Sequence, residues 1–236
     1  NPNGAVTSRM THSHPNMAQI PSSSSPYGED CRACWTVPED YRLVGIDASG
    51  LELRMLAHYL NDEGYTNEIL NGDIHTANQR LADLESRDQA KTFIYALLYG
   101  AGDAKLGSVV GRGRAHGKGL RQRFFDNLPS FKKLTDRVQR EAKSGFIKAL
   151  DGRKLTVRSE HAALNTLLQG AGAIVMKKAL IILDETIRTN NWDAKFVANV
   201  HDEWQIECHV YDAVDVGKAG VEAIIQAGIE LNLNCP

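Results

Sequence analysis

Residues 41–60, YRLVGIDASGLELRMLAHYL, predict a strand that is followed directly by a helix. YRLVGID is a short apolar run of the kind found in buried strands, and it ends on Asp47. Beyond the glycine turn, Leu51, Met55 and Leu56 fall on one side of a helix. Asp47 therefore lies where a strand meets a helix, and there it either caps the helix or holds a ligand.

A second acid lies in a comparable place near the other end of the chain. The runs AKFVANV and WQIECHV alternate in and out and are separated by HDE, which is the pattern of a β-hairpin with Asp202 at its tip. Sheet pairing can bring Asp47 and Asp202 together. Two carboxylates so placed can hold two divalent ions about 3.5 to 4 Å apart, which stabilise the attacking and leaving oxygens of an in-line displacement. The plainer interpretation is a helix cap at Asp47 and a turn residue at Asp202.

The segment RDQAKTFIYALLYG carries Arg87, Lys91, Tyr95 and Tyr99 at every fourth position. Residues four apart on a helix form one slanting stripe, which here is cationic at its start and aromatic beyond. Cations are electrostatically misplaced at the positive end of a helix, so they indicate an anionic partner. A nucleoside triphosphate fits this stripe, with phosphates on Arg87 and Lys91 and a base or sugar on Tyr95. The alternative is a helix that starts with solvated cations and buries its aromatics.

Composition excludes several classes of protein. The 236 residues are 42% hydrophobic and 24% charged, as in a globular chain with one large or two modest domains. No apolar run approaches the roughly 18 residues of a membrane helix, and no basic and apolar leader is present, so we expect no membrane partner. The four cysteines suit a reducing cytosol. Cys31 and Cys34 form CRAC, but no second pair follows at zinc spacing.

Charge is distributed unevenly along the chain. Residues 101–160 carry 15 Lys and Arg against 6 Asp and Glu, whereas the remainder carries 12 against 23. One segment can therefore contact phosphates while another holds metal ions. A solvated helical surface is the alternative explanation for the basic segment.

Periodicity predicts a mixed α and β chain. Further helices are expected over about 74–84, 87–99, 116–126, 130–144, 161–188 and 212–231, and a short strand with a turn is expected in ALDGRKLTVRS. The first 40 or so residues are rich in Ser, Pro, Asn and Gly and are expected to be loop.

Several motifs resemble those of family A DNA polymerases. RDQAKTFIYALLYG resembles the family's fingers motif, DASGLELR its first palm motif and VHDEWQ its last. GAVTSRMTHSHPNMAQIP, DGRK and AALNTLLQGAGA are also similar to family motifs, although Ser8 stands where glycine is usual. NPNGAVT, EILNGDIHT and HAALNTLLQ are most similar to the replicative polymerases of T-seven-type bacteriophages. The resemblance covers nearly the whole chain.

The resemblance implies a magnesium site and a nucleotide site. Asp47 and Asp202 would ligate two Mg²⁺ ions, with the carbonyl of Ala48 as an added ligand and Glu203 as a helper. Arg87 and Lys91 would bind the triphosphate and act in catalysis, and the tyrosine at position 95 implies tolerance of dideoxynucleotides. His75 would support the phosphates, Glu52 would reject a ribose 2′-hydroxyl and Tyr99 would pack near the templating base. The implied nucleotide-binding residues are thus Arg87, Lys91, Tyr95, Glu52, His75 and Tyr99.

The resemblance also implies contacts with primer-template DNA. Asn165 and Gln169 are four apart, so one helix face presents both amides to the minor groove, where they check geometry. The alternative for these amides is a polar stripe in solvent. The residues implied to line the primer terminus and the minor groove are Arg9, Asn165, Gln169, His201 and His161.

The implied fold is α+β, with an antiparallel palm sheet and an inserted helical fingers subdomain. Its expected parts are a first palm segment (1–59), the fingers (60–164) and a second palm segment (165–236), with the thumb, the exonuclease and the last palm strand outside this chain. The implied partners are primer-template DNA and deoxynucleoside triphosphates. A processivity factor and a replicative helicase would be contacted through regions outside this chain.

The implied function is DNA-directed deoxynucleotidyl transfer in phage replication, in the cytoplasm of a bacterial host. Two alternatives stay open: a fragment that binds primer-template without turnover, and a single-subunit RNA polymerase. Glu52, Tyr95 and Tyr99 favour the DNA enzyme over the RNA enzyme, because they match the DNA branch.

Overall fold

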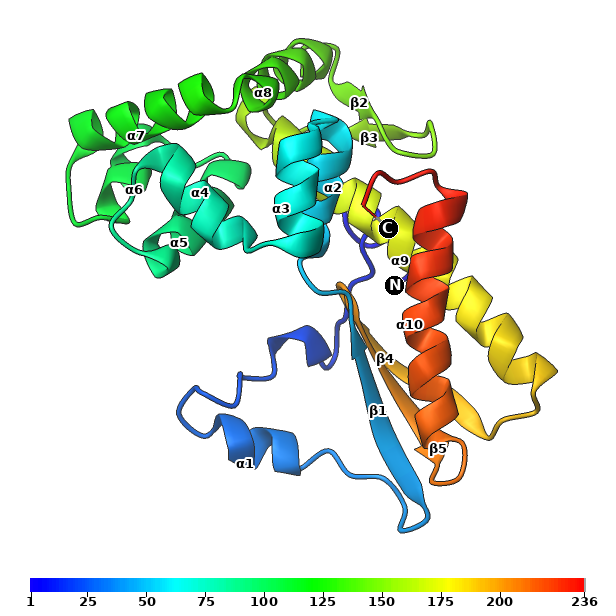
Figure 1. Ribbon diagram of the computed structural model, residues 1–236. Coiled ribbons are helices and arrows are strands. Elements are labelled where there is room, and N and C mark those ends of the chain that lie inside the picture. The colour runs from blue at the N-terminus through cyan, green and yellow to red at the C-terminus, as the bar shows by residue number, and fades with distance from the viewer. Residues whose placement is uncertain (236) are drawn as a thin grey trace. The chain divides into compact units, whose positions relative to one another are not determined.

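The computed structural model describes residues 1–235 (Figure 1). The chain divides into two compact units. Residues 1–51 and 170–232 form the first, which we call the sheet unit, and residues 52–169 and 233–235 form the second, the helical unit. The expected palm and fingers boundaries at 59/60 and 164/165 stay predictions.

The sheet unit is built on three antiparallel strands. They are β1 (Tyr41–Asp47), β4 (Ala194–Val200) and β5 (Glu203–His209), in the order β1-β5-β4. The register of β1 on β5 runs from Tyr41 opposite His209 to Asp47 opposite Glu203. Strands from the two ends of the chain therefore meet in one sheet, as the sequence predicted.

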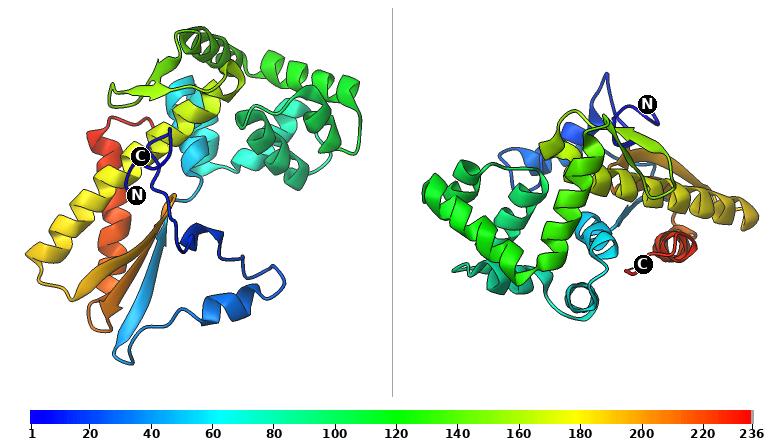
Figure 2. Two further views of the ribbon diagram at one scale, coloured as in Figure 1. Left: turned by 180° about the vertical axis from the view of Figure 1, so that it is seen from behind. Right: turned by 90° about the horizontal axis from the view of Figure 1, so that it is seen from above.

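The two faces of this sheet have different partners. Trp204, Ile206 and Cys208 alternate along β5 and are buried, and α10 (Ala213–Glu230) packs on β1 and β5. Figure 2 shows α10 and the latter half of α9 (Ala163–Thr189) on the same side of the strands. The opposite face and the N-terminal segment, with 3₁₀ helix η1 (Met17–Gln19) and α1 (Gly28–Ala33), enclose a cavity of about 350 Å³.

The helical unit contains most of the remaining helices. They are α2 (Leu51–Leu60), α3 (Glu63–Asn71), α4 (Ile74–Ala82), α5 (Arg87–Leu98), α6 (Asp103–Ser108), α7 (Arg114–Asn127) and α8 (Pro129–Ala142). After them come β2 (Phe146–Lys148), β3 (Lys154–Thr156) and the 3₁₀ helix η2 (Glu160–Ala162), which leads into α9. The helices predicted from periodicity are confirmed to within about two residues at each end, whereas α1, α3 and α6 were not predicted.

Local sequence explains where several of these helices begin. Side chains of Asp62, Asp73 and Ser86 accept backbone N–H groups at the starts of α3, α4 and α5, which satisfies donors that have no partner within the helix. Pro129 occupies the first turn of α8, where its missing N–H costs nothing.

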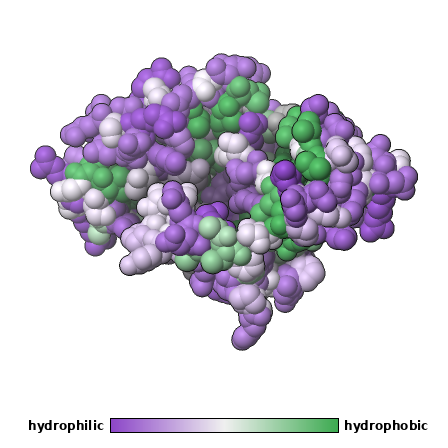
Figure 3. All heavy atoms as spheres, turned by 90° about the horizontal axis from the view of Figure 1, so that it is seen from below, coloured by the Kyte–Doolittle hydropathy of each residue, from purple (hydrophilic) through white to green (hydrophobic). Residues whose placement is uncertain are grey.

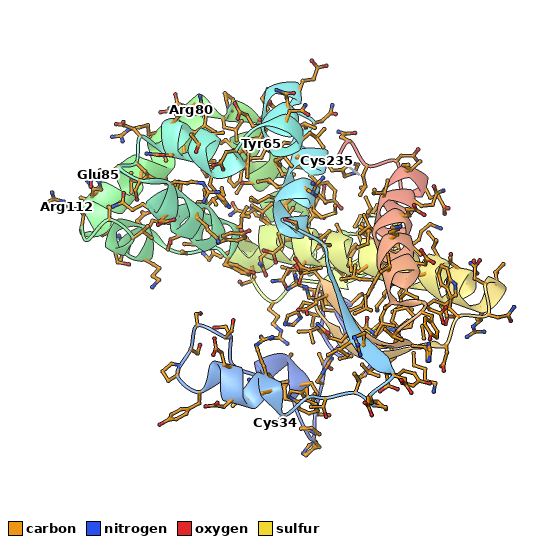
Figure 4. All side chains as sticks on the ribbon, turned by 60° about the horizontal axis from the view of Figure 1, so that its bottom comes forward. Cys34, Tyr65, Arg80, Glu85, Arg112 and Cys235 are labelled. Atoms are coloured by element: carbon orange, nitrogen blue, oxygen red, sulfur yellow. The ribbon has the colours of Figure 1, made fainter. Side chains whose placement is uncertain are left out.

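Aromatic rings form the core of the helical unit. The rings of Phe93 and Phe131 contact Phe124 edge-on with centroids 5.7 and 5.3 Å away, and all three side chains are almost fully buried. Tyr65 of α3, labelled in Figure 4, is also buried and donates its hydroxyl to Oδ1 of Asn78 at 3.2 Å. Burial is the main cause that raises the pKa of Tyr65 above its ordinary value.

Apolar residues are concentrated inside the protein. Figure 3 shows hydrophilic residues over most of the face in view, with apolar residues in separate patches. The segment Glu160–Thr189 is long and apolar enough to cross a membrane by length and composition, which the sequence analysis did not expect. However, 67% of its most apolar window is buried in the protein, as in the core helix of a soluble protein.

Candidate active site

The two predicted metal acids lie together at one end of the sheet. Asp47 is the last residue of β1 and faces Glu203, the first residue of β5. Asp202 belongs to the two-residue turn between β4 and β5, and its carbonyl accepts the backbone N–H of Ala48 at 3.0 Å. This bond ties the hairpin turn to the residue that follows Asp47. Residues separated by most of the chain are therefore held side by side.

The turn that carries Asp202 has an unusual backbone. His201 has φ of +59°, a left-handed conformation that favours glycine and costs a side chain roughly 1 to 2 kcal/mol. Strained residues of this kind persist where surrounding structure determines them, and they are frequent in functional sites. His201 also shares a small crevice with Arg9 and with Lys177, a cation that the sequence analysis did not name.

The electrostatics of this acidic end favour a cation. Burial, followed by the negative charges of Asp202 and Glu203, raises the pKa of Asp47 above its ordinary value. Among residues 1–235, no group of three or more Asp, Glu, His or Cys side chains forms a complete metal site. Mg²⁺ is commonly held by one or two carboxylates, with water and substrate phosphates completing its shell, so a pair of carboxylates such as Asp47 and Asp202 could hold this ion.

Glu203 points to the open face of the sheet. It lines the 350 Å³ cavity with Gln205 and Glu207, and the amide of Gln205 donates a short hydrogen bond to its carboxylate. Glu203 is therefore next to Asp47 in register and is oriented by its own strand.

The predicted phosphate residues gather in the helical unit. Arg87 opens α5, and its Nε donates to Oδ2 of Asp73 at 2.6 Å. Oδ1 of Asp73 accepts the backbone N–H of His75 at 3.0 Å. Asp73 therefore links the start of α5 to the start of α4, where backbone N–H groups point outward.

His75 joins the stripe on α5. Its ring centroid lies 6.2 Å from that of Tyr95. Burial, then the charges of Arg87 and Lys91, lower its pKa, and the opposing charge of Asp73 raises it. Nδ1 of His75 is buried, and no hydrogen-bond partner for it exists among the described residues. An orphaned nitrogen beside two cations fits a site for an anionic ligand.

Glu52 and Tyr99 form a second contact at the far end of α5. The hydroxyl of Tyr99 lies 3.1 Å from both carboxylate oxygens of Glu52. Gly100 follows with φ of +75°, and a Cβ there would lie 2.4 Å from the carbonyl oxygen of His161. The glycine therefore lets the backbone at His161 approach the end of α5.

Asn165 and Gln169 lie on the first turns of α9. Both are partly exposed, whereas the residues between them are buried. The two amides thus occupy one accessible stripe, as their spacing predicted.

The structure brings the predicted residues together in two groups. The sheet unit holds Asp47, Ala48, Asp202, Glu203, Arg9 and His201, and the helical unit holds Glu52, His75, Arg87, Lys91, Tyr95, Tyr99, His161, Asn165 and Gln169. Asp73 was missed by the sequence analysis. Its signal is an aspartate directly before the helix that carries His75, within EILNGDIHT.

The sequence model of DNA polymerase family A matches residues 1–236, and the chain belongs to this family. It is 46% identical over 268 aligned positions to the DNA-directed DNA polymerases of Enterobacteria phage T3 and Escherichia phage T7. These alignments cover 100% of the chain and 38% of either relative. DNA polymerase I of Aquifex aeolicus is 34% identical, with 95% of the chain and 41% of the relative covered.

A solved structure shares the fold. The polymerase domain of Pol1 from M. smegmatis, in complex with DNA primer-template and dNTP, matches with a TM-score of 0.88 and 25% identity. The match covers 96% of this chain and 44% of that chain. The predicted family and the α+β fold class are confirmed, and the likeness to phage polymerases is confirmed with them. The roles of individual residues stay predictions.

Proposed function

We propose that this chain is the catalytic region of a template-directed DNA polymerase. The observation that carries the proposal is the pair Asp47 and Asp202, held side by side by the bond between Ala48 and Asp202. The primer 3′-oxygen would form a bond to the α-phosphorus of a deoxynucleoside triphosphate. The bond to the β-phosphate would break, and pyrophosphate would leave.

Asp47, Asp202 and the carbonyl of Ala48 would hold two Mg²⁺ ions, with Glu203 beside them. When bound, the ions supply charge stabilisation at the attacking and leaving oxygens. The raised pKa of Asp47 supports this assignment, because a carboxylate that is partly desolvated and lies beside like charges is stabilised by a bound cation. Family membership supports divalent-metal chemistry in general, and the identity and number of ions are part of the proposal.

The helical unit would bind and orient the triphosphate. Arg87 and His75 would contact its phosphates, and Lys91 would donate a proton to the departing pyrophosphate. Tyr95 would stack on the incoming nucleotide. The bond between Tyr99 and Glu52 holds the Glu52 carboxylate, which would exclude a ribose 2′-hydroxyl. Catalysis would thus rest on positioning and electrostatics rather than covalent chemistry.

Each unit also carries side chains that we propose contact primer-template DNA. Arg9 and His201 would contact it from the sheet unit, and Asn165, Gln169 and His161 would contact it from the helical unit. We place the reaction in phage DNA replication in the host cytoplasm, because the T3 and T7 phage relatives are DNA-directed DNA polymerases. A processivity factor and a replicative helicase are further proposed partners.

One observation favours a second candidate function. The chain spans 38% of the length of the phage relatives that it matches. The alternative is that residues 1–236 bind primer-template without turnover.

Primer extension with Mg²⁺ tests both candidates, comparing the 236-residue chain with its Asp202→Ala variant. We expect extension to fall by roughly 10²- to 10⁴-fold in the variant, since a bound metal ion contributes several kcal/mol. Equal extension by the two proteins would show that Asp202 is not part of the catalytic site. Binding of primer-template by the unsubstituted chain without extension would establish the second candidate.

A further inference from the structure

The hairpin formed by β2 and β3 has one buried face and one cationic face. Ile147 and Leu155 are 1% and 2% exposed and point into the helical unit. The outer face carries Lys148 and Lys154, which lie directly opposite each other in the register. Figure 1 shows this hairpin beside α8.

Two like charges directly opposite in an antiparallel pair destabilise the pair. Among the described residues, neither Lys148 nor Lys154 has an ion-pair partner. Asp151 is the acid of the connecting turn, and Arg153 already binds it at 2.6 Å. The ammonium groups of Lys148 and Lys154 therefore repel each other, because the acid of the hairpin, Asp151, is paired with Arg153 instead.

The hairpin also holds one of these ammonium groups in place. Nζ of Lys154 lies 4.3 Å from the ring centroid of Phe146, which is 37% exposed. A cation over an aromatic ring is attracted by the ring's negative face. Exposed Lys143 and Arg158 flank the hairpin, so residues 143–158 carry five cations and a single acid.

We infer that the outer face of this hairpin binds the phosphodiester backbone of single-stranded template DNA. A polyanion relieves the repulsion between Lys148 and Lys154, and cations beside an aromatic ring are typical of surfaces that bind single strands. The inference rests on the proposed function for the identity of the ligand, and it adds a surface that the reaction itself does not use.

The arrangement favours phosphates over an acidic peptide. Bidentate arginines recognise single carboxylates and phosphates, whereas lysines act as point charges, which suit the repeated phosphates of a nucleic-acid backbone. Arg153, the arginine within the hairpin, is already engaged with Asp151.

The test is fluorescence anisotropy of a labelled oligothymidylate titrated with the full chain, at several salt concentrations. The variant is Lys148→Ala with Lys154→Ala. We expect this variant to bind the oligothymidylate about ten-fold more weakly at 0.1 M salt. The slope of log K against log salt should become shallower by about 1.4, because each lost phosphate contact on a single strand changes it by about 0.7 and two contacts are removed. The variant with arginine at both positions should restore binding.

A matched control removes two lysines from the sheet unit, Lys195→Ala with Lys218→Ala, and should leave binding unchanged. An equal loss in this control, or no binding by the unsubstituted chain, would overturn the inference. Binding of duplex DNA and of an acidic peptide is measured in separate titrations. The inference is also overturned if the hairpin substitutions weaken binding of one of these ligands and leave binding of the oligothymidylate unchanged.

Failure of the inference and failure of the proposed function are distinguishable. The hairpin variant should still extend a primer whose template overhang is one nucleotide long. The Asp202→Ala variant should fail to extend the same primer if the proposed function is correct. Circular dichroism should show that the variant is folded.

Discussion

At the scale of single residues, Asp47 ends β1 beside two acidic neighbours, Asp202 and Glu203. Its pKa is raised in the folded protein, so folding favours the protonated form. The ionised carboxylate therefore lowers the free energy of unfolding once the pH exceeds its unfolded pKa. That penalty is absent in acid, where the group is protonated in both states. The acid is retained in a place where it costs stability, as is common for a ligand-binding group.

Replacing Asp47 with asparagine should separate stability from function. We expect Asp47→Asn to unfold at a slightly higher temperature than the parent at pH 7 without metal, and at the same temperature near pH 3. Thermal unfolding by circular dichroism checks both points. Calorimetry should show in parallel that Mg²⁺ binding is lost. A lower unfolding temperature at pH 7 would contradict the assigned cause of the pKa shift.

Asp73 is the residue whose importance appears only in the structure. Its carboxylate engages Nε of Arg87 and leaves the two terminal amino groups of the guanidinium available. The ion pair lowers the pKa of Asp73 well below its usual range, so the carboxylate stays ionised even in mild acid. We therefore regard Asp73 as a positioning residue for the proposed nucleotide site.

The variant Asp73→Asn keeps a side-chain oxygen that can cap α4 but removes the charge that orients Arg87. We expect the KM for the triphosphate to rise roughly three- to ten-fold, with a smaller change in kcat. Steady-state extension kinetics measure the split between the two. The matched control Asp62→Asn alters the cap of α3 and should leave KM unchanged. If both variants change KM equally, helix capping rather than positioning of Arg87 is responsible.

At the scale of elements, α6 and α7 approach each other through glycine. A Cβ at Gly117 of α7 would lie 1.9 Å from the carbonyl oxygen of Asp103 and 2.5 Å from the backbone N of Gly107. Backbone atoms cannot yield as a flexible side chain does. Nothing lies within 4 Å of the corresponding position at Gly119, in the same helix.

These two glycines provide a matched pair of substitutions. Gly117→Ala should lower the free energy of unfolding by about 1 to 3 kcal/mol, since overpacking forces the helices apart. Gly119→Ala should raise it by up to about 1 kcal/mol, because alanine favours a helix over glycine. Urea unfolding followed by circular dichroism measures both. Equal effects of the two substitutions would show that helix propensity, and not close contact, determines the change in the free energy of unfolding.

The elements that periodicity missed share a physical explanation. In α3 only Tyr65 is buried, and α6 has six residues with Leu106 and Gly107 buried. A short helix with one apolar contact shows no repeating pattern in its sequence. Packing against neighbouring helices stabilises it instead, and that information lies elsewhere in the chain.

At the scale of the whole molecule, the two units are assembled from segments that alternate along the chain. The sheet unit takes its strands from both ends of the sequence, and the helical unit receives the basic segment 101–160. The helical unit therefore has more Lys and Arg than Asp and Glu, 19 against 14, whereas the sheet unit has 8 Lys and Arg against 15 Asp and Glu. This separation explains how a chain with a net charge of −2 can contain a strongly basic surface.

The sequence by itself determined the strands, the long helices, the family and the residue types suited to each role, because these depend on local spacing and on ordered motifs. Only the tertiary structure decided the bond from Ala48 to Asp202, the contact of Asp73 with Arg87 and the facing lysines of the β2–β3 hairpin. Each of these depends on register or on packing between elements, which a pattern along one segment cannot specify. A shift of one residue in a strand would reverse every side chain on it, and folding of the whole chain selects the register.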